Sequence, residues 1–188
     1  AWTIESERLE PVPIPVDDEG VDVGALSAAR TDAAVITPAH SLPLGAVLAP
    51  ERRRRLAAWA RDHGVLLLED DYDAELRYDR DPAGTLQGLA PDVVVLAGSV
   101  SKTLAPALRL GYLVADWPVM SRLLPLKTDA GTGAIEQLVV ADYFGGRFHE
   151  HVAELKPRLA AKLDAMVEAV EREFGTAAEF ARPAGGIF

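Results

Sequence analysis

Cysteine is absent from the chain, aromatic residues make up only 6% of it, and lysine occurs at only four positions. Without cysteine the protein has neither a disulfide framework nor a thiolate metal site. No run of about 18 apolar residues occurs, which excludes a transmembrane helix of ordinary length. The first 20 residues are acidic and rich in proline, unlike a secretory signal peptide. We therefore expect a cytoplasmic protein with no membrane contact.

Positive charge is also scarce. The 188 residues carry 29 acidic against 19 basic side chains, a formal net charge of −10. Such a surface repels a phosphate backbone, so the chain by itself is a poor candidate for binding DNA. Hydrophobic residues make up 49% of the chain, which excludes intrinsic disorder and suffices for a core. The length fits one globular domain or a large part of a bigger one.

Helix-like and strand-like segments alternate through the first two thirds of the chain. Short apolar runs at 33–36, 65–68, 93–97 and 110–115 predict strands. Pro50 starts a predicted helix that Gly64 ends, and its run of four arginines, 52–55, is interpreted as a solvated face. This alternation predicts an α/β fold with a mostly parallel sheet flanked by helices.

From Pro118 onward the pattern becomes helical. Apolar residues between Val152 and Phe174 recur every three or four positions, which predicts a long amphipathic helix. Pro157 must kink or divide that helix. The chain then ends in a Gly-Gly turn that resembles the entry to a new strand, so we expect a fragment of a larger protein.

Polar side chains follow two of the predicted buried strands, at the edge of the sheet where ligands gather in α/β proteins. Lys102 follows the run at 93–97, where desolvation favours a neutral amine that can act as a Schiff-base nucleophile. Acidic residues follow the run at 65–68, and nearby donors for a phosphate are Ser99, Ser101, Thr103 and Arg109. Together these groups describe a site for pyridoxal 5'-phosphate (PLP). Taken singly, each also fits a surface residue or a solvated turn.

Three segments carry a resemblance to a known family. Residues 98–112 (GSVSKTLAPALRLGY), in which Arg109 follows Lys102 by seven positions, resemble the cofactor-lysine segment of fold-type I PLP enzymes. Residues 69–78 (EDDYDAELRY) and 37–45 (TPAHSLPLG) are similar to the MocR-type regulators of the GntR superfamily. Those regulators fuse a DNA-binding winged helix to an aminotransferase-like domain.

The resemblance implies a role for each matching residue. Lys102 matches the lysine that forms the aldimine with PLP, and Asp70 matches the acid that pairs with the pyridine nitrogen, with Asp71 as the alternative one register away. The other implied cofactor-binding residues are Tyr72 at the ring hydroxyl, and Ser99, Ser101 and Arg109 at the phosphate. His40 either contacts the ring region or is a loop histidine with local partners. Asp71 and Asp73 are otherwise interpreted as local capping or solvated groups.

Leu42 departs from the enzyme pattern, because it stands where the enzymes carry the asparagine of Asn-Pro-Thr-Gly. Leucine cannot donate a hydrogen bond to the ring hydroxyl, which favours a sensor over a full transaminase. The resemblance therefore implies an amine or amino-acid effector, a homodimer, and DNA binding only through a domain outside this chain. The alternative is an active class I/II aminotransferase of the aminoadipate type.

The resemblance also implies a division of the chain. Residues 1–145 match part of the PLP-binding large domain, and residues 146–188 match a long helix leading into a truncated small domain. The family's glycine-rich phosphate loop and stacking aromatic residue would precede residue 1, and its substrate-binding arginine would follow Phe188. We therefore expect these 188 residues alone to bind PLP weakly.

Overall fold

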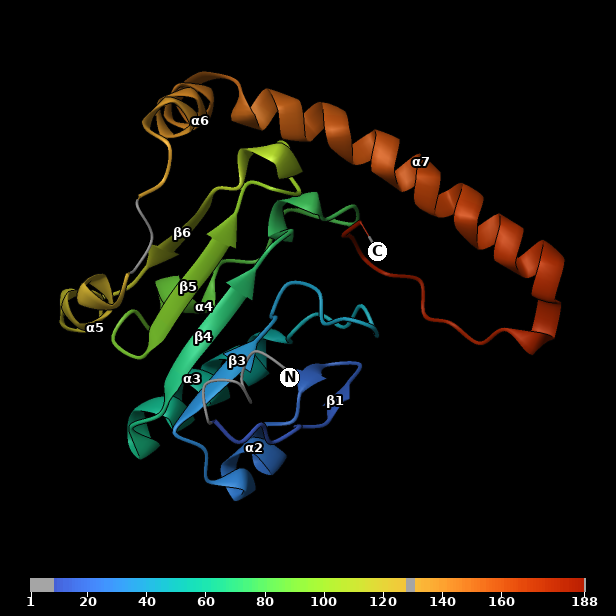
Figure 1. The fold of residues 1–188 in the computed structure, drawn as a ribbon. Coiled ribbons are helices and arrows are strands. Elements are labelled where there is room, and N and C mark those ends of the chain that lie inside the picture. The colour runs from blue at the N-terminus through green and yellow to red at the C-terminus, as the bar shows by residue number, and fades with distance from the viewer. Residues whose placement is uncertain (1–8, 128–130, 188) are drawn as a thin grey trace.

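A four-stranded sheet lies at the centre of the computed structural model, which describes residues 9–127 and 131–187 (Figure 1). The strands lie in the order β3 (Ala33–Ile36), β4 (Leu66–Asp71), β5 (Val94–Ser99) and β6 (Gly111–Val114). The first three are parallel, and β6 pairs with β5 in the antiparallel direction. The prediction of an α/β fold with a mostly parallel sheet is confirmed.

Helix α2 (Val23–Ala29) precedes β3, α3 (Pro50–His63) connects β3 to β4, and α4 (Leu86–Leu89) lies between β4 and β5. At the start of α3, the missing N–H of Pro50 leaves no helical hydrogen bond unmade. At its end, Gly64 adopts a left-handed conformation with φ 65°, and its N–H reaches the carbonyls of Ala60 and Arg61. The sequence signals at both ends therefore predict the helix correctly.

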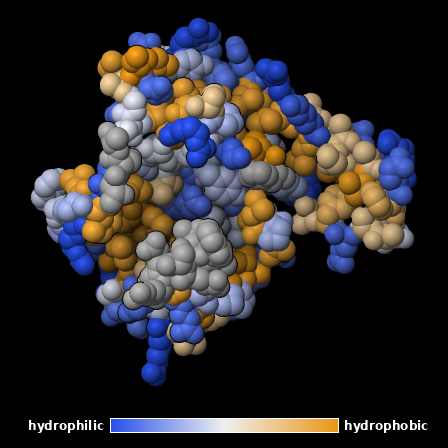
Figure 2. Space-filling view, in the orientation of Figure 1, coloured by the Kyte–Doolittle hydropathy of each residue, from blue (hydrophilic) through white to orange (hydrophobic). Residues whose placement is uncertain are grey.

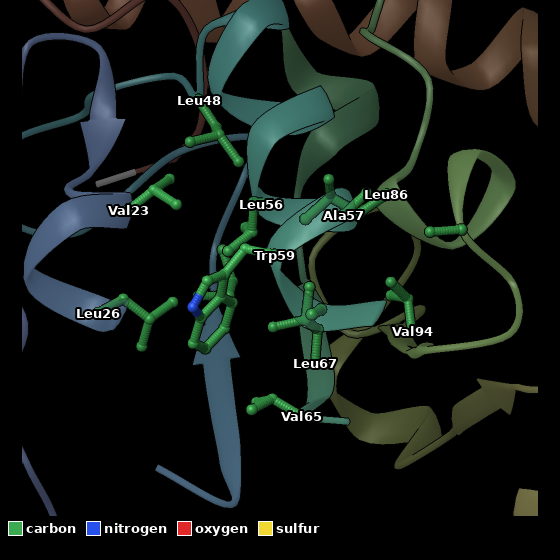
Figure 3. Packing of buried hydrophobic residues seen from close by; sticks show 13 residues of the cluster. Val23, Leu26, Leu48, Leu56, Ala57, Trp59, Val65, Leu67, Leu86 and Val94 are labelled. Atoms are coloured by element: carbon green, nitrogen blue, oxygen red, sulfur yellow. The ribbon is translucent and has the colours of Figure 1, made fainter. Parts of the chain in front are cut away.

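One hydrophobic core joins α2 and α3 to the sheet. Leu56 of α3, Leu67 of β4 and Val94 of β5 are each at most 1% exposed, and Figure 3 shows their side chains where α3 lies across the strands. Burying such a side chain contributes about 1.5–3 kcal/mol. This packing holds β4 and β5 firmly, and with them the loops at their carboxyl ends.

Apolar side chains also reach the surface on the second face of the sheet. Because side chains alternate along a strand, Val35, Leu66 and Leu113 point away from the core that contains Leu67. They are 59%, 36% and 48% exposed. Among the described residues, these side chains are therefore exposed to solvent, whereas those on the opposite face of the sheet are buried against α3.

The C-terminal third is helical, with α5 (Trp117–Leu123), α6 (Ala134–Gly146) and α7 (Phe148–Phe174). The 27-residue α7 continues through Pro157, so of the two predicted alternatives, a kink or a division, the division does not occur. One lost N–H does not interrupt the other hydrogen bonds of a helix this long. Figure 1 shows α7 extending along one side of the molecule, and Figure 2 shows hydrophobic side chains over α6, where Ile135 and Leu138 are exposed.

Short elements complete the fold. β1 (Val16–Asp17) and β2 (Gly20–Val21) form a small hairpin. The single-turn 3-10 helices are η1 (Ala74–Leu76), η2 (Pro106–Leu108), η3 (Leu124–Leu126) and η4 (Gly175–Ala177). Within residues 9–127 and 131–187, no helix has both the length and the apolar character needed to cross a membrane.

Candidate functional site

Lys102 lies in a tight turn directly after β5. The carbonyl of buried Val100 accepts hydrogen bonds from the N–H groups of Leu104 (2.9 Å) and Ala105 (3.2 Å). The carbonyl of Thr103, a residue only 3% exposed, bonds to the ring Nε2 of His151 from α7 at 2.8 Å. Hydrogen bonds within the turn and to α7 therefore fix the backbone around Lys102, whose side chain is half-buried.

Ser99, Ser101 and Arg109 come together at the same turn. The Ser99 hydroxyl accepts the N–H of Ser101 at 3.1 Å and donates to the carbonyl of Leu110 at 3.4 Å. Ser99 is also paired with Gly111 at the start of β6, which brings the neighbouring Arg109 close to the end of β5. Arg109 itself adopts a left-handed conformation, φ 50°, and its side chain is exposed.

Asp70 and Asp71 lie on opposite faces of β4. Asp70 pairs with Ala97, so its side chain shares a face with Ser99, two residues further along β5. Asp71 pairs with Gly98, which in turn pairs with Tyr112 of β6, and the Asp71 carboxylate accepts the N–H of Ala74 at 3.1 Å. The capping role expected for Asp71 is therefore confirmed, and Asp70 is the one that shares a face with Ser99.

Burial perturbs both carboxyl groups. It raises the pKa of Asp70, and the charge of Asp73 adds to this effect. It raises the pKa of Asp71 to about 6, with Glu75 as the next contributor, while the bond from Ala74 opposes the change. Because the two side chains point to opposite faces of β4, only the Asp70 carboxyl lies on the face of Ser99, and a cation beside it would lower its raised pKa again.

His40 and Asp73 form a buried pair beside this edge. His40 is 5% and Asp73 1% exposed, and His40 Nδ1 lies 2.8 Å from Asp73 Oδ1. The interpretation of Asp73 as a solvated or capping group is therefore wrong. The two residues are 33 positions apart, so only the fold brings them together. Tyr72 donates its hydroxyl proton to the carbonyl of His40 at 2.8 Å.

An open pocket of about 300 Å³ adjoins this pair. Its lining includes His40, Leu42, Tyr72 and Asp73 on one side and the chain around Gly185 on the other. No arginine or lysine lines it, and no cluster of metal-ligating side chains occurs among the described residues. Of the expected cofactor-binding residues, His40 and Tyr72 line this pocket, and Lys102, Asp70 and the phosphate donors lie outside its lining.

Arg53 and Glu69 hold neighbouring loops through hydrogen bonds to their backbones, and sequence reasoning assigned neither of them this role. Arg53, 9% exposed, donates to the carbonyls of Leu48 (3.0 Å), Pro38 (3.2 Å) and Gly84, and its burial lowers its pKa. The solvated interpretation of the arginine run is thus wrong for Arg53. Its position three residues before the buried Leu56 was the signal that could have identified it.

The fold and the site both have relatives among known proteins. A family model described as aminotransferase class I and II matches residues 3–188. The chain is 32% identical over 175 residues to YdeL of Bacillus subtilis, described as an uncharacterized HTH-type transcriptional regulator, covering 91% of this chain and 38% of YdeL. It is 39% identical over 136 residues to the HTH-type pyridoxine biosynthesis transcriptional regulator PdxR of Corynebacterium glutamicum, covering 71% of this chain and 30% of PdxR.

A solved aminotransferase also has the same fold. LysN of Thermus thermophilus, an alpha-aminoadipate aminotransferase complexed with N-(5'-phosphopyridoxyl)-L-leucine, matches with a TM-score of 0.87 and 28% identity, over 93% of this chain and 48% of LysN. The chain thus spans less than half the length of each of these three proteins. Since the family model matches nearly every residue, this chain belongs to the aminotransferase class I and II family.

Proposed function

We propose that this chain is the PLP-binding, effector-sensing part of a MocR-type transcriptional regulator of the GntR superfamily. One observation carries the proposal: Lys102, Asp70 and the phosphate donors around Ser99 lie at the carboxyl ends of the adjacent strands β4 and β5. The similarity to YdeL and PdxR, both HTH-type regulators, supports a regulatory role over a metabolic one.

The chemistry of these side chains suits PLP. Serine hydroxyls and the guanidinium of Arg109 can donate to its phosphate, the carboxylate of Asp70 can pair with a protonated ring nitrogen, and Lys102 offers an amine. When bound, PLP supplies an aldehyde that an amine captures and a ring that withdraws electrons.

Asp70 and a protonated ring nitrogen would stabilise each other's charge. Burial raises the pKa of the Asp70 carboxyl, and a cation beside it would lower that pKa again. The turn from Val100 to Ala105 holds the Lys102 amine at the end of the neighbouring strand. These residues thus orient the cofactor, while the effector would exchange with the Lys102 amine.

The whole protein would carry a DNA-binding domain outside this chain, act as a homodimer and work in the cytoplasm. Residues 1–145 would belong to its large domain, and residues 146–188 would lead into the small domain. An exchange at Lys102 would change the position of the DNA-binding domain. An active aminotransferase is the second candidate, favoured by the similarity to LysN.

Amine titration with a product assay distinguishes the two candidates. The protein is loaded with excess PLP, an amino-acid panel is added, and visible absorbance and released 2-oxo acid are both measured. A regulator changes its absorbance with no continuing release of 2-oxo acid, whereas an aminotransferase releases it over many turnovers. Lys102→Ala should abolish the absorbance response, and Lys162→Ala on the exposed side of α7 serves as the matched control. A full response from Lys102→Ala contradicts the proposal.

A further inference from the structure

The side chain of His151 joins the turn of Lys102 to the long helix α7. His151 Nε2 lies 2.8 Å from the carbonyl oxygen of Thr103, the residue that follows Lys102, although the two are 48 positions apart. Figure 1 shows the first turns of α7 beside the loop that follows β5. Because a carbonyl oxygen only accepts, Nε2 carries the proton of this hydrogen bond. Thr103 is 3% exposed, so a donor from α7 satisfies the carbonyl group of a buried residue.

The first turns of α7 direct His151 toward the rest of the molecule. Phe148 and Val152 are 7% and 8% exposed, and positions three and four apart share one face of a helix, so His151 lies on this buried face. Tyr143 of α6 meets the imidazole edge to face, with ring centroids 5.7 Å apart and an interplanar angle of 75°. His149, by contrast, is exposed. The imidazole of His151 is thus held by α6 and α7 in the position from which it donates.

The other contacts of the turn fix its two ends. Val100 is buried in an apolar cluster that includes a residue of α6, and Leu104 packs against that cluster. The carbonyl of Val100 also accepts the N–H of Leu104 at 2.9 Å. Among the described residues, no backbone N–H bonds to the Thr103 carbonyl, which is held by His151. The orientation of the peptide group beside Lys102 therefore depends on His151.

We infer that His151 is a positioning residue for Lys102: the hydrogen bond that it donates to Thr103 holds the turn in the orientation that presents the Lys102 amine to PLP. The inference rests on the proposed function for its ligand and goes beyond it, because it makes the attachment of PLP depend on α7. In attachment, the Lys102 nitrogen bonds to the aldehyde carbon of PLP, and the aldehyde oxygen leaves as water with the two protons of the neutral amine. Without the donor, the turn adopts further orientations, and the fraction that is competent for attachment falls.

The same link acts in the opposite direction, because a coupling between two sites is reciprocal. If the contact of α7 with the turn favours attachment at Lys102, then attachment favours that contact by the same factor. Helix α7 has 27 residues and is about 40 Å long, so its first turns are continuous with a part of the chain far from Lys102. His151 therefore gives the state of Lys102 a route to α7.

Titration with PLP tests the role of His151. His151→Leu removes the donor, His151→Gln retains an N–H at the end of the side chain, and His149→Leu on the exposed side of α7 is the matched control. The apparent dissociation constant for PLP, followed by visible absorbance, should rise about 2- to 12-fold in His151→Leu, the ratio that corresponds to one hydrogen bond. It should rise less in His151→Gln and stay at the parent value in His149→Leu. A constant equal to that of the parent in His151→Leu overturns the inference.

A PLP analogue separates positioning of the amine from a general effect on the fold. 4-Deoxypyridoxine 5'-phosphate carries a methyl group in place of the aldehyde and forms no bond to a lysine. Its affinity, measured by calorimetry, should be the same in His151→Leu and in the parent, because its binding does not use the Lys102 amine. An equal loss of affinity for PLP and for the analogue contradicts the positioning role.

A measurement without PLP separates this inference from the proposed function. In the ligand-free chain, nitrogen-15 NMR should show the His151 proton on Nε2, and His151→Leu should speed amide exchange at Leu104 in the turn. A proton on Nδ1 alone, or unchanged exchange at Leu104, refutes the hydrogen bond itself, whatever PLP does. An intact hydrogen bond in a protein that never attaches PLP to Lys102 refutes the proposed function, and with it the role toward PLP.

Discussion

Gly185 is the residue at which the last described segment meets the site, and we expect Gly185→Ala to detach that segment. A Cβ there would lie 2.5 Å from the carbonyl oxygen of Leu76 and 2.8 Å from the Cα of Arg77. Both are backbone atoms beside the strand-like pairing of Arg77 with Gly185, so neither can rotate aside. The segment around Gly185 must therefore move.

The cost can be worked from the bonds that this movement breaks. The N–H of Tyr78 donates to Ala184 and the N–H of Gly186 donates to Leu76, each at 2.9 Å. A backbone hydrogen bond has a net worth of about 0.5–1.5 kcal/mol, so losing two lowers local stability by about 1–3 kcal/mol. That difference corresponds to amide exchange about 5–150-fold faster at both N–H groups.

Hydrogen exchange measured by NMR at Tyr78 and Gly186 tests this estimate. Gly146→Ala at the end of α6 is the control, because a Cβ there meets nothing within 4 Å and alanine suits a helix better. The control should leave exchange at both amides unchanged. Unchanged exchange at both amides in Gly185→Ala would refute the reasoning.

Two further predictions concern the end of β4. Because the pKa of Asp71 is about 6 in the folded chain against 3.8 for an ordinary aspartate, the folded form binds more protons, and stability falls as pH rises through that window. Asp71→Asn should therefore stabilise the fold at pH 7 by about 1–2 kcal/mol and leave it unchanged near pH 3, as measured by urea unfolding; equal effects at both pH values would contradict the assigned cause. Glu69, 2% exposed, accepts the N–H groups of Leu86 and Gln87 at 2.9 Å each. Glu69→Ala strands both donors and should cost about 2–5 kcal/mol in the same assay, with Glu69→Gln losing clearly less; equal losses would show that the hydrogen bonds matter little.

Local patterns predict much of this fold because they depend on neighbouring residues. The strand at Ala33–Ile36 and the helix ends at Pro50 and Gly64 follow from apolar runs, proline placement and glycine capping. Only the strand ends shift, since β4 extends through Asp70 and Asp71 into the acidic residues. Backbone pairing with β5 continues there although the side chains are polar.

What the sequence does not predict depends on contacts between distant segments. The pairing of His40 with Asp73 requires the loop after β3 to meet the end of β4, and no periodicity predicts that meeting. Arg53 was misjudged because a run of four arginines suggests solvent, yet three backbone carbonyls satisfy its guanidinium in the interior. Burial of a charged side chain follows from such partners, which are known only once the loops are placed.

Peptide mapping after reduction tests the central claim most directly. The protein is incubated with excess PLP, reduced with borohydride, digested, and searched by mass spectrometry for the phosphopyridoxyl group on each of its four lysines. We predict the label on Lys102, with Asp70→Asn reducing its yield and Asp71→Asn, on the opposite face of β4, leaving it near the parent level. A label spread evenly over Lys127, Lys156 and Lys162, or one that persists at the same yield in Lys102→Ala, would contradict the account.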